Sequence, residues 1–242
     1  MSVLSGILIA NISLALLAAL IYWQGTMHAE QLRDVRRQFS KLSSTDPVTN
    51  LPNRARLHER LTEALESEGP DPALMVIDLD GFKVVNDTLG HETGDELLKA
   101  VAMRMTSCLH EKDMLARVGG GEFAALITRA DAEVRATQTA QSIDEAMHAP
   151  FRIGEDVINM KAHIGIAPTL KGQVPATEIV RRADVAMFAA KNDRLERVRT
   201  YSPAMDEALQ LRRTINSELD LALMNNQLKL VYQPLVCART GK

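Results

Sequence analysis

The chain has 242 residues, of which 46% are hydrophobic and 24% are charged, and its formal net charge is -3. This composition excludes a disordered or fibrous protein and is sufficient for one main globular domain with appendages. The small net charge gives no general attraction to nucleic acid, so any polyanion must be bound at a local site. The two cysteines, Cys108 and Cys237, do not form a disulfide framework, which fits a reducing compartment.

Residues 1–24 are predicted to form a transmembrane anchor. No charged residue occurs from Met1 to Met27, and Leu, Ile and Ala dominate the segment from Val3 to Trp23. At about 1.5 Å per residue this segment would cross a hydrocarbon core of roughly 30 Å. A cleaved signal peptide is the alternative, but the usual positive first region and a small-residue cleavage site are absent.

Basic residues follow this segment directly and predict its orientation. They are Arg33, Arg36, Arg37 and Lys41. Because basic residues near a span favour the cytoplasmic side, we expect a single-pass protein of the inner membrane with its C-terminal domain in the cytoplasm.

Residues 25–43 are predicted to form a juxtamembrane signalling helix. Leu32, Val35, Phe39 and Leu42 recur at alternating steps of three and four, which is typical of the seam of a parallel coiled coil. A homodimer is therefore expected. Because two heptads are short, packing of this helix on its own domain stays open as the alternative.

The first elements of the globular part are a helix and a buried strand. Pro52 stands in the first turn of a helix that ends before Gly69. The apolar run Ala73–Ile77 then predicts a strand that ends at Asp78 and Asp80. After a polar connection, a helix is expected to begin at Gly94-Asp95 and to run to Leu109.

The later elements are predicted from hydrophobic periodicity and from glycine turns. In chain order they are a hairpin of Met114–Val118 and Phe123–Ile127, a helix Val134–Met147, a hairpin of Phe151–Ile153 and Val157–Ile166, a helix capped by Thr177, a strand Arg197–Tyr201 and a helix after Pro203. This mixture of helices and hairpins predicts an α+β fold with a mostly antiparallel sheet flanked by helices.

Two features of this pattern could handle a nucleotide. Carboxylates at a strand end, here Asp78 and Asp80, suit Mg²⁺, which takes oxygen ligands and keeps substrate phosphates as partners. The glycines Gly119, Gly120 and Gly121 would let a backbone approach phosphate oxygens closely. Each feature also has an ordinary structural explanation, because aspartates and glycines are common turn formers.

Five motifs, in order, carry a resemblance to a known family. They are Asp46-Pro47-Val48-Thr49-Asn50-Leu51-Pro52-Asn53-Arg54, Asp78-Leu79-Asp80-Gly81-Phe82-Lys83-Val84-Val85-Asn86-Asp87 with Gly94-Asp95, Arg117-Val118-Gly119-Gly120-Gly121-Glu122-Phe123, Ile164-Gly165-Ile166-Ala167, and Arg182-Ala183-Asp184-Val185-Ala186-Met187-Phe188-Ala189-Ala190-Lys191. Residues 44–203 resemble the GGDEF domains, the diguanylate cyclases that join two GTP molecules into cyclic di-GMP. The resemblance implies a sheet like that of nucleotidyl cyclases and polymerase palms.

The resemblance also implies roles for single residues. Asp78 and the backbone of Leu79 would bind Mg²⁺ (or Mn²⁺), while Asn86 and Asp95 would read the guanine edge. An amide and a carboxylate suit guanine, which offers both donors and acceptors. Lys83, Lys191 and the turn glycines, Gly119 and Gly120, would lie near the phosphates.

The chain departs from the family at the third signature position. Active cyclases carry Asp or Glu there, as a metal ligand near the attacking hydroxyl, and this chain has Gly121. Since metal-assisted phosphoryl transfer depends on neutralising charge and activating the attacking oxygen, we expect a loss on the order of 10² in rate or more. Glu122 follows, but neighbouring strand residues point to opposite faces, so Glu122 is not expected to replace the missing acid.

The inhibitory product site of the family is also altered. Its Arg-x-x-Asp pattern is replaced by His110-Glu111-Lys112-Asp113, and a neutral histidine lacks the guanidinium that grips phosphate or guanine. Residues 204–242 are predicted to form a linker helix and the truncated start of an EAL domain, the cyclic-di-GMP phosphodiesterase family. Because this barrel needs about 250 residues, we expect no phosphodiesterase activity from this chain.

Three functions follow from these observations. The first is a membrane-anchored cyclic-di-GMP signalling protein that binds GTP or another guanine nucleotide and regulates signalling through a degenerate domain. The second is an active diguanylate cyclase, whose two half-sites a homodimer would bring together. The third is a dimeric scaffold without catalysis.

Overall fold

The computed structural model describes residues 44–225 except 170, 173 and 194, together with 227, 229 and 231. The predicted anchor (1–24), the predicted juxtamembrane helix (25–43) and most of residues 226–242, within the predicted start of an EAL domain, lie outside the described residues. Within the described part, no helix combines the length and apolar character needed to cross a membrane.

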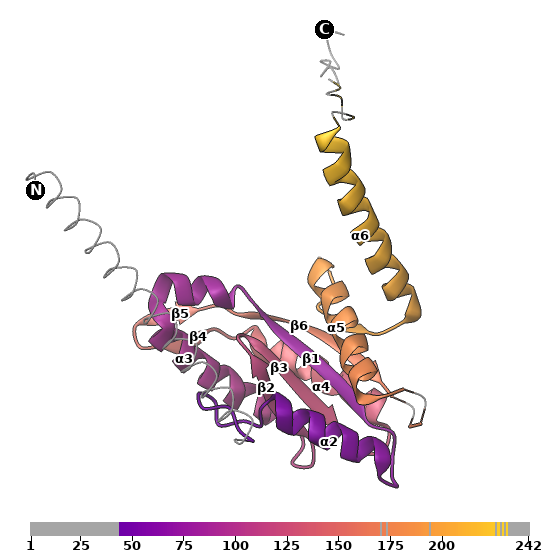
Figure 1. The fold of residues 1–242 in the computed structure, drawn as a ribbon. Helices are drawn as coiled ribbons and strands as arrows, with labels where there is room; N and C mark the ends of the chain where they lie inside the picture. The colour runs from indigo at the N-terminus through magenta and orange to yellow at the C-terminus, as the bar shows by residue number, and fades with distance from the viewer. Residues whose placement is uncertain are drawn as a thin grey trace, which may run out of the picture.

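A five-stranded sheet forms the centre of the domain, in the order β2-β3-β1-β6-β7 (Figure 1). The strands are β1 (Ala73–Asp80), β2 (Met114–Gly119), β3 (Glu122–Ile127), β6 (Lys161–Pro168) and β7 (Val198–Thr200). The pairs from β2 to β6 are antiparallel, whereas β7 runs parallel to β6. The predicted α+β class and the mostly antiparallel sheet are confirmed.

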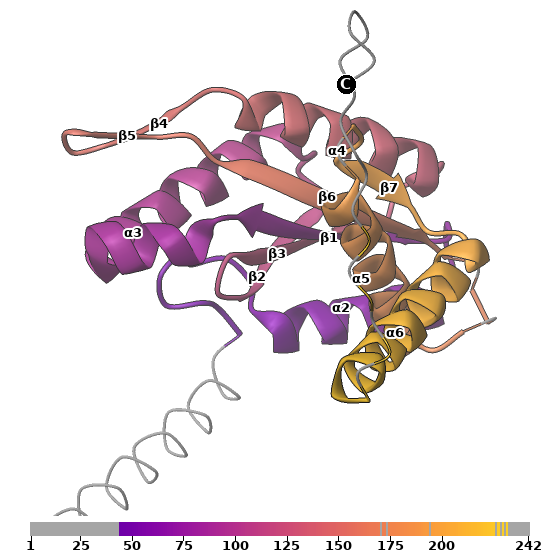
Figure 2. The same cartoon turned by 90° about the horizontal axis from the view of Figure 1, so that it is seen from above.

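Helices cover both faces of this sheet (Figure 2). They are α2 (Arg54–Glu66), α3 (Phe82–Cys108), α4 (Ala132–Met147), α5 (Ala176–Asn192) and α6 (Pro203–Met224). The helices α3 and α4 lie on one face, and α2 and α5 lie on the other. The last helix, α6, packs on α5 and extends away from the sheet (Figure 1).

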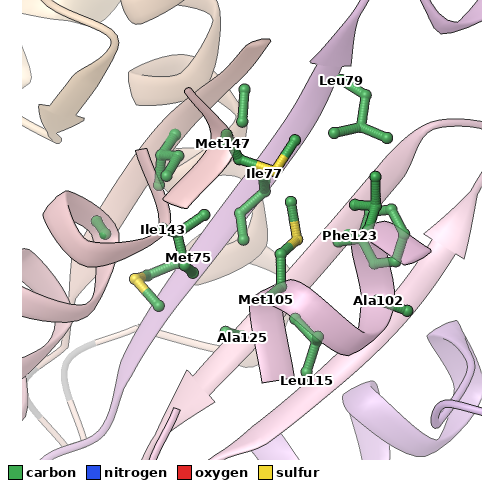
Figure 3. Close-up of a cluster of buried hydrophobic side chains, with 14 of the residues drawn as sticks. Met75, Ile77, Leu79, Ala102, Met105, Leu115, Phe123, Ala125, Ile143 and Met147 are labelled. Atoms are coloured by element: carbon green, nitrogen blue, oxygen red, sulfur yellow. The ribbon is translucent and has the colours of Figure 1, made fainter. Parts of the chain in front are cut away.

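Side chains of β1 point alternately to the two faces of the sheet, and each face carries a hydrophobic core. Met75, Ile77 and Leu79 point towards α3 and α4, where Figure 3 shows them beside Met105 and Phe123. Leu74 and Val76 of β1 belong to the second cluster, under α2 and α5. Because each large aliphatic or aromatic side chain gains roughly 1.5–3 kcal/mol on full burial, a strand buried on both sides is a rigid base for the polar residues at its end.

The polar connection predicted before Gly94 is wrong, because this segment is helical. The helix α3 begins at Phe82, and only Gly90, with φ 85° and ψ 163°, interrupts it. Phe82 and Val85 pack against the main core from the first part of this helix. Because only these two apolar residues of the first part of α3 pack against the core, the helical periodicity of this segment is weak in the sequence.

The second predicted hairpin is divided differently in the structure. The strands β4 (Phe151–Ile153) and β5 (Asp156–Ile158) form a separate two-stranded sheet, and β6 begins only at Lys161. Met160 is buried between them, and β6 then leaves the hairpin to pair with β1. A continuous strand from Val157 was therefore a wrong prediction, since pairing with a distant strand overrides the local pattern.

The prediction that Thr177 caps the next helix is also wrong, because Pro175 is the N-cap of α5.

Candidate functional site

A row of polar side chains crosses the sheet near the end of β1. Asp78 lies opposite Glu122 on β3 and opposite His163 on β6. Residues directly opposite in antiparallel strands point to the same face, so these three side chains share the face covered by α2 and α5. The last turn of α5 adds Lys191 to this row.

A cavity of about 520 Å³ opens at this edge of the sheet. Its lining residues are Asp78, Leu79, Gly81, Phe82, Lys83, Asn86, Gly119, Gly120, Gly121, Glu122 and Lys191. The structure thus brings together the residues predicted from the sequence for catalysis, metal binding and nucleotide binding, except Asp80 and Asp95, which do not line this cavity.

Lys191 is paired with Asp78. Its Nζ donates to Oδ2 of Asp78, and the side chains are 45% and 15% exposed respectively. The hydrogen bond to Asp78 raises the pKa of Lys191, and the charges of Asp78, Asp80 and Glu122 raise it further against the effect of burial. The lysine is therefore held as an ammonium ion inside the cavity.

The shape of the glycine hairpin depends on Arg117. Its Nε and Nη2 atoms donate to the carbonyl oxygen of Gly120, at 3.1 and 2.9 Å. Its Nη1 atom donates to both carboxylate oxygens of Asp46, at 3.0 and 3.1 Å. Because Gly120 has φ 51°, a backbone conformation that favours glycine, this turn is both permitted by sequence and fixed by a side chain.

The pair of Arg117 and Asp46 is largely buried, with side chains 10% and 16% exposed. Burial raises the pKa of Asp46, but hydrogen bonds from the backbone and hydroxyl of Thr49 and from Arg117 outweigh it, so the pKa lies below its usual value. The segment before α2 is thereby attached to the hairpin.

Gly121 faces Phe82. A Cβ atom at this position would lie 3.0 Å from Cβ of Phe82 and 3.2 Å from its ring. The carbonyl oxygen of Gly121 accepts a hydrogen bond of 3.1 Å from the amide of Leu79. The backbone at position 121 is thus held against β1, and no carboxylate projects from it into the cavity.

Glu122 lies beside Asp78 in the sheet, although its carboxylate has another neighbour. Its Oε2 atom is 3.8 Å from Nη2 of Arg54, and both side chains are well exposed. As the sequence predicted, residues 121 and 122 point to opposite faces. It is Glu122, however, that shares the face of Asp78, and the missing side chain would face Phe82.

Asn86 lies where the two parts of α3 meet. A Cβ atom on Gly94 would lie 1.8 Å from Oδ1 of Asn86, so only glycine permits this close approach. Asp95 follows Gly94 directly and is exposed, but it does not line the cavity. Lys83, in the first turn of α3, is exposed at the cavity wall.

His163 is a buried polar residue in the same row. The side chain is 8% exposed, and its Nδ1 atom has no hydrogen-bond partner among the described residues. Burial lowers the pKa of His163, with Asp80 and Lys191 acting in opposite directions. The imidazole next to Asp78 is therefore neutral at pH 7.

The residues of the altered inhibitory site have other partners. The side chain of Asp113 is fully buried and accepts two hydrogen bonds from Arg129, from Nε at 3.2 Å and from Nη2 at 2.8 Å. His110 is exposed, and its Nδ1 atom accepts from the amide of Lys112. Asp113 thus serves an internal ion pair.

A larger cavity, of about 810 Å³, lies on the other side of the hairpin, between α2, α5 and the sheet. Aliphatic residues such as Leu61 and Val76 line it, and it shares Gly119 and Glu122 with the smaller cavity. The polar residues with a predicted role line the smaller cavity, so we assign the candidate site there.

Sequence reasoning missed the contacts of four residues at this site. The partners Arg117 and Asp46 stand far apart in the chain, and Arg54 reaches the hairpin from α2. Each lies in one of the five motifs that resemble the family, but no local sequence pattern shows which side chain it contacts. The phenyl ring under Gly121, that of Phe82, was also unpredicted.

The donor set offers little to a divalent metal. The cavity is lined by two carboxylates, Asp78 and Glu122. Asp78 has no arginine neighbour, but it is paired with Lys191. Position 121 supplies no side chain, and Glu122 lies near Arg54. Across the described part of the chain, no group of three or more His, Cys, Asp or Glu residues could hold a metal ion. Mg²⁺ usually takes one or two free carboxylates from a protein and its other oxygen ligands from substrate phosphates and water, and these residues offer no carboxylate without a basic neighbour.

Comparison with known proteins gives consistent relatives. The chain is 34% identical to the cyclic di-GMP phosphodiesterase PdeR of Escherichia coli, over 89% of this chain and 32% of PdeR. It is 34% identical to MucR of Pseudomonas aeruginosa, a bifunctional diguanylate cyclase/cyclic di-GMP phosphodiesterase, over 88% of this chain and 31% of MucR. The chain spans about a third of the length of these relatives.

Solved structures agree with the fold. The GGDEF domain of TpbB (YfiN) from Pseudomonas aeruginosa superposes with a TM-score of 0.64 at 34% identity, covering 69% of this chain and 99% of that one. The coiled coil and GGDEF domain of DgcB from Caulobacter crescentus, solved with cyclic di-GMP, gives 0.60 at 30% identity, over 73% and 95% of the two chains. The family model described as "Diguanylate cyclase, GGDEF domain" matches residues 43–197, and the chain belongs to this family.

Proposed function

We propose that this chain is a cyclic-di-GMP signalling protein whose GGDEF domain binds GTP or another guanine nucleotide and acts mainly as a regulator, with weak or no turnover. One observation carries the proposal. A single cavity gathers the residues suited to binding a nucleotide, while position 121 contributes no acid to it.

Binding is assigned to the groups that line the cavity. The amide of Asn86 supplies both donors and acceptors for the guanine edge, and Asp95, in the part of α3 after Gly90, would complete this contact. The turn at Gly119 and Gly120 gives phosphate oxygens access to the backbone, and Lys83 adds a positive charge at the wall.

Low turnover follows from the missing carboxylate. Transfer of a nucleotidyl group requires activation of the attacking hydroxyl and compensation of charge on the reacting phosphate. Relatives in this family generally use divalent metal ions, Mg²⁺ or Mn²⁺, for this chemistry. Here Asp78 and the backbone of Leu79, which line the cavity, would be the remaining ligands for such an ion, and Gly121 can supply neither function.

An active cyclase is the second candidate, because Glu122 lies opposite Asp78 on the same face. A small movement away from Arg54 would bring a second carboxylate to the metal position, and a homodimer would supply the second half-site. A dimeric scaffold without nucleotide is the third candidate, and it gives no reason for the lysines and Asn86 to share a cavity.

The surroundings of the domain are part of the proposal. Residues 1–24 would anchor the chain in the inner membrane and residues 25–43 would form the dimer helix, with the domain in the cytoplasm. The helix α6 and the residues after it would connect to an EAL domain.

The test measures nucleotide binding and product together. The purified chain is incubated with GTP and Mg²⁺, GTP binding is followed by calorimetry, and cyclic di-GMP by chromatography. Binding without product at ordinary cyclase rates is the expected result. Asn86→Ala should abolish binding, whereas Asn192→Ala, on the surface of α5, is the matched control. Rapid product formation would establish the active cyclase, and no binding would leave the scaffold.

A further inference from the structure

We infer that guanine nucleotide binds to this domain without a divalent metal, because Lys191 takes the place of the metal as the cation that receives the phosphates. This inference rests on the proposed nucleotide binding and adds the ionic form of the ligand, a metal-free guanosine triphosphate.

The first step is the position of Lys191. Its Nζ atom contacts Oδ2 of Asp78, so a positive charge already lies at the end of β1. The lysine comes from the last turn of α5, where the helix carbonyls favour a cation. Since its side chain is 45% exposed, the ammonium group can reach a ligand in the cavity without leaving this helix.

The second step is the charge count around the cavity. Mg²⁺ usually takes one or two carboxylates from a protein and its other oxygen ligands from substrate phosphates and water, and the carboxylates here are Asp78, engaged by Lys191, and Glu122, near Arg54. With Gly121 at the third signature position, both remaining carboxylates of the cavity already have a basic neighbour, so neither is free to hold a metal. An ammonium ion needs no such coordination and neutralises phosphate as a point charge.

The third step is the competition that this pair creates. Phosphate and Asp78 are both anions, and both would be partners of the one ammonium group of Lys191. In a metal-free complex Asp78 therefore opposes binding, because it repels the phosphates and occupies the lysine. In a metal-bridged complex Asp78 supports binding, because it holds the metal. The two cases predict opposite effects of removing its charge.

The experiment uses the full chain purified in detergent, with GTP as the probe, in excess EDTA and in saturating Mg²⁺. We expect GTP affinity to change by less than about threefold between the two conditions. In EDTA, Asp78→Asn should bind GTP roughly five- to tenfold more tightly than the wild type. Lys191→Met should bind roughly tenfold more weakly, while Lys99→Met, an exposed lysine of α3, should bind as the wild type does.

The outcomes separate this inference from the proposed function. Binding that falls tenfold or more in EDTA, or that weakens in Asp78→Asn, overturns the inference and leaves nucleotide binding in place. No binding in either condition overturns both. Circular dichroism and the melting temperature of each variant show whether it is folded, and Asp78→Ala provides a second removal of the same charge should the asparagine variant be unfolded.

Discussion

Replacing Gly121 by Glu tests the reason for low turnover most directly. The new Cβ atom would lie 3.0 Å from Cβ of Phe82, so the phenyl ring must move by a few tenths of an ångström. Such overpacking costs about 1–3 kcal/mol, while the loss of the glycine's freedom in the unfolded chain returns about 0.4–1 kcal/mol. We expect Gly121→Glu to lower the free energy of unfolding by about 0–2.5 kcal/mol.

The effect on catalysis should be larger than the effect on stability. A carboxylate at position 121 would add an acid to the wall of the cavity that Asp78 also lines, and one such charge-stabilising group contributes on the order of 10² in rate. Cyclic di-GMP formation from GTP and Mg²⁺ measures this gain, and urea unfolding measures the stability. Gly121→Gln is the matched control, because it has the same shape as Gly121→Glu and meets the same contact with Phe82 without the charge.

The comparison of these two variants decides the matter. If Gly121→Glu is folded and binds GTP but forms no more product than Gly121→Gln, the missing acid at position 121 does not limit turnover. The same reasoning fails if the wild type already forms product at the rate of Gly121→Glu, since Glu122 would then supply the second carboxylate.

Three further predictions concern the buried charges. Arg117→Met should lower the free energy of unfolding by about 3–5 kcal/mol in urea titrations, because it leaves the buried carboxylate of Asp46 without its partner. Adding Asp46→Asn to this variant should recover part of the lost stability. Asp113→Asn should destabilise the fold through Arg129 and leave the affinity for cyclic di-GMP unchanged in calorimetry; a large loss of affinity would show that Asp113 still serves a product site. Burial lowers the pKa of His163 in the folded chain below its usual value near 6.5, so the unfolded chain binds a proton there more readily. The contribution of His163 to the free energy of unfolding is therefore complete above pH 6.5 and is lost as the pH falls through the lower pKa of the folded state. His163→Gln should lose less stability than the wild type between about pH 7.5 and pH 5, and an equal loss would contradict this assignment.

The elements with strong periodicity were predictable from the sequence. The run from Ala73 ends abruptly at Asp78, and the glycines interrupt two apolar runs, so a strand and a hairpin followed directly from the pattern. The helix from Phe82 and the start of β6 at Lys161 were missed because tertiary pairing and two buried side chains decide them, not local periodicity.

The contacts inside the site could be predicted only in part. A resemblance placed Asp78 and Lys191 in one site, but their direct pairing joins residues 113 positions apart. His163 next to Asp78 follows from the register of β6 with β1, and that register is a property of the whole sheet. The partner of Asp113, Arg129, likewise follows from the fold of the β2–β3 hairpin.

The hairpin keeps its shape without an acid at position 121, because nothing that holds it uses that side chain. Arg117 holds the carbonyl of Gly120, and the amide of Leu79 holds the carbonyl of Gly121. Both contacts are to backbone atoms, so they are the same whichever residue occupies position 121. The shape of the hairpin is therefore independent of the side chain at position 121, so replacing an acid there by glycine removes a carboxylate and leaves the turn in place.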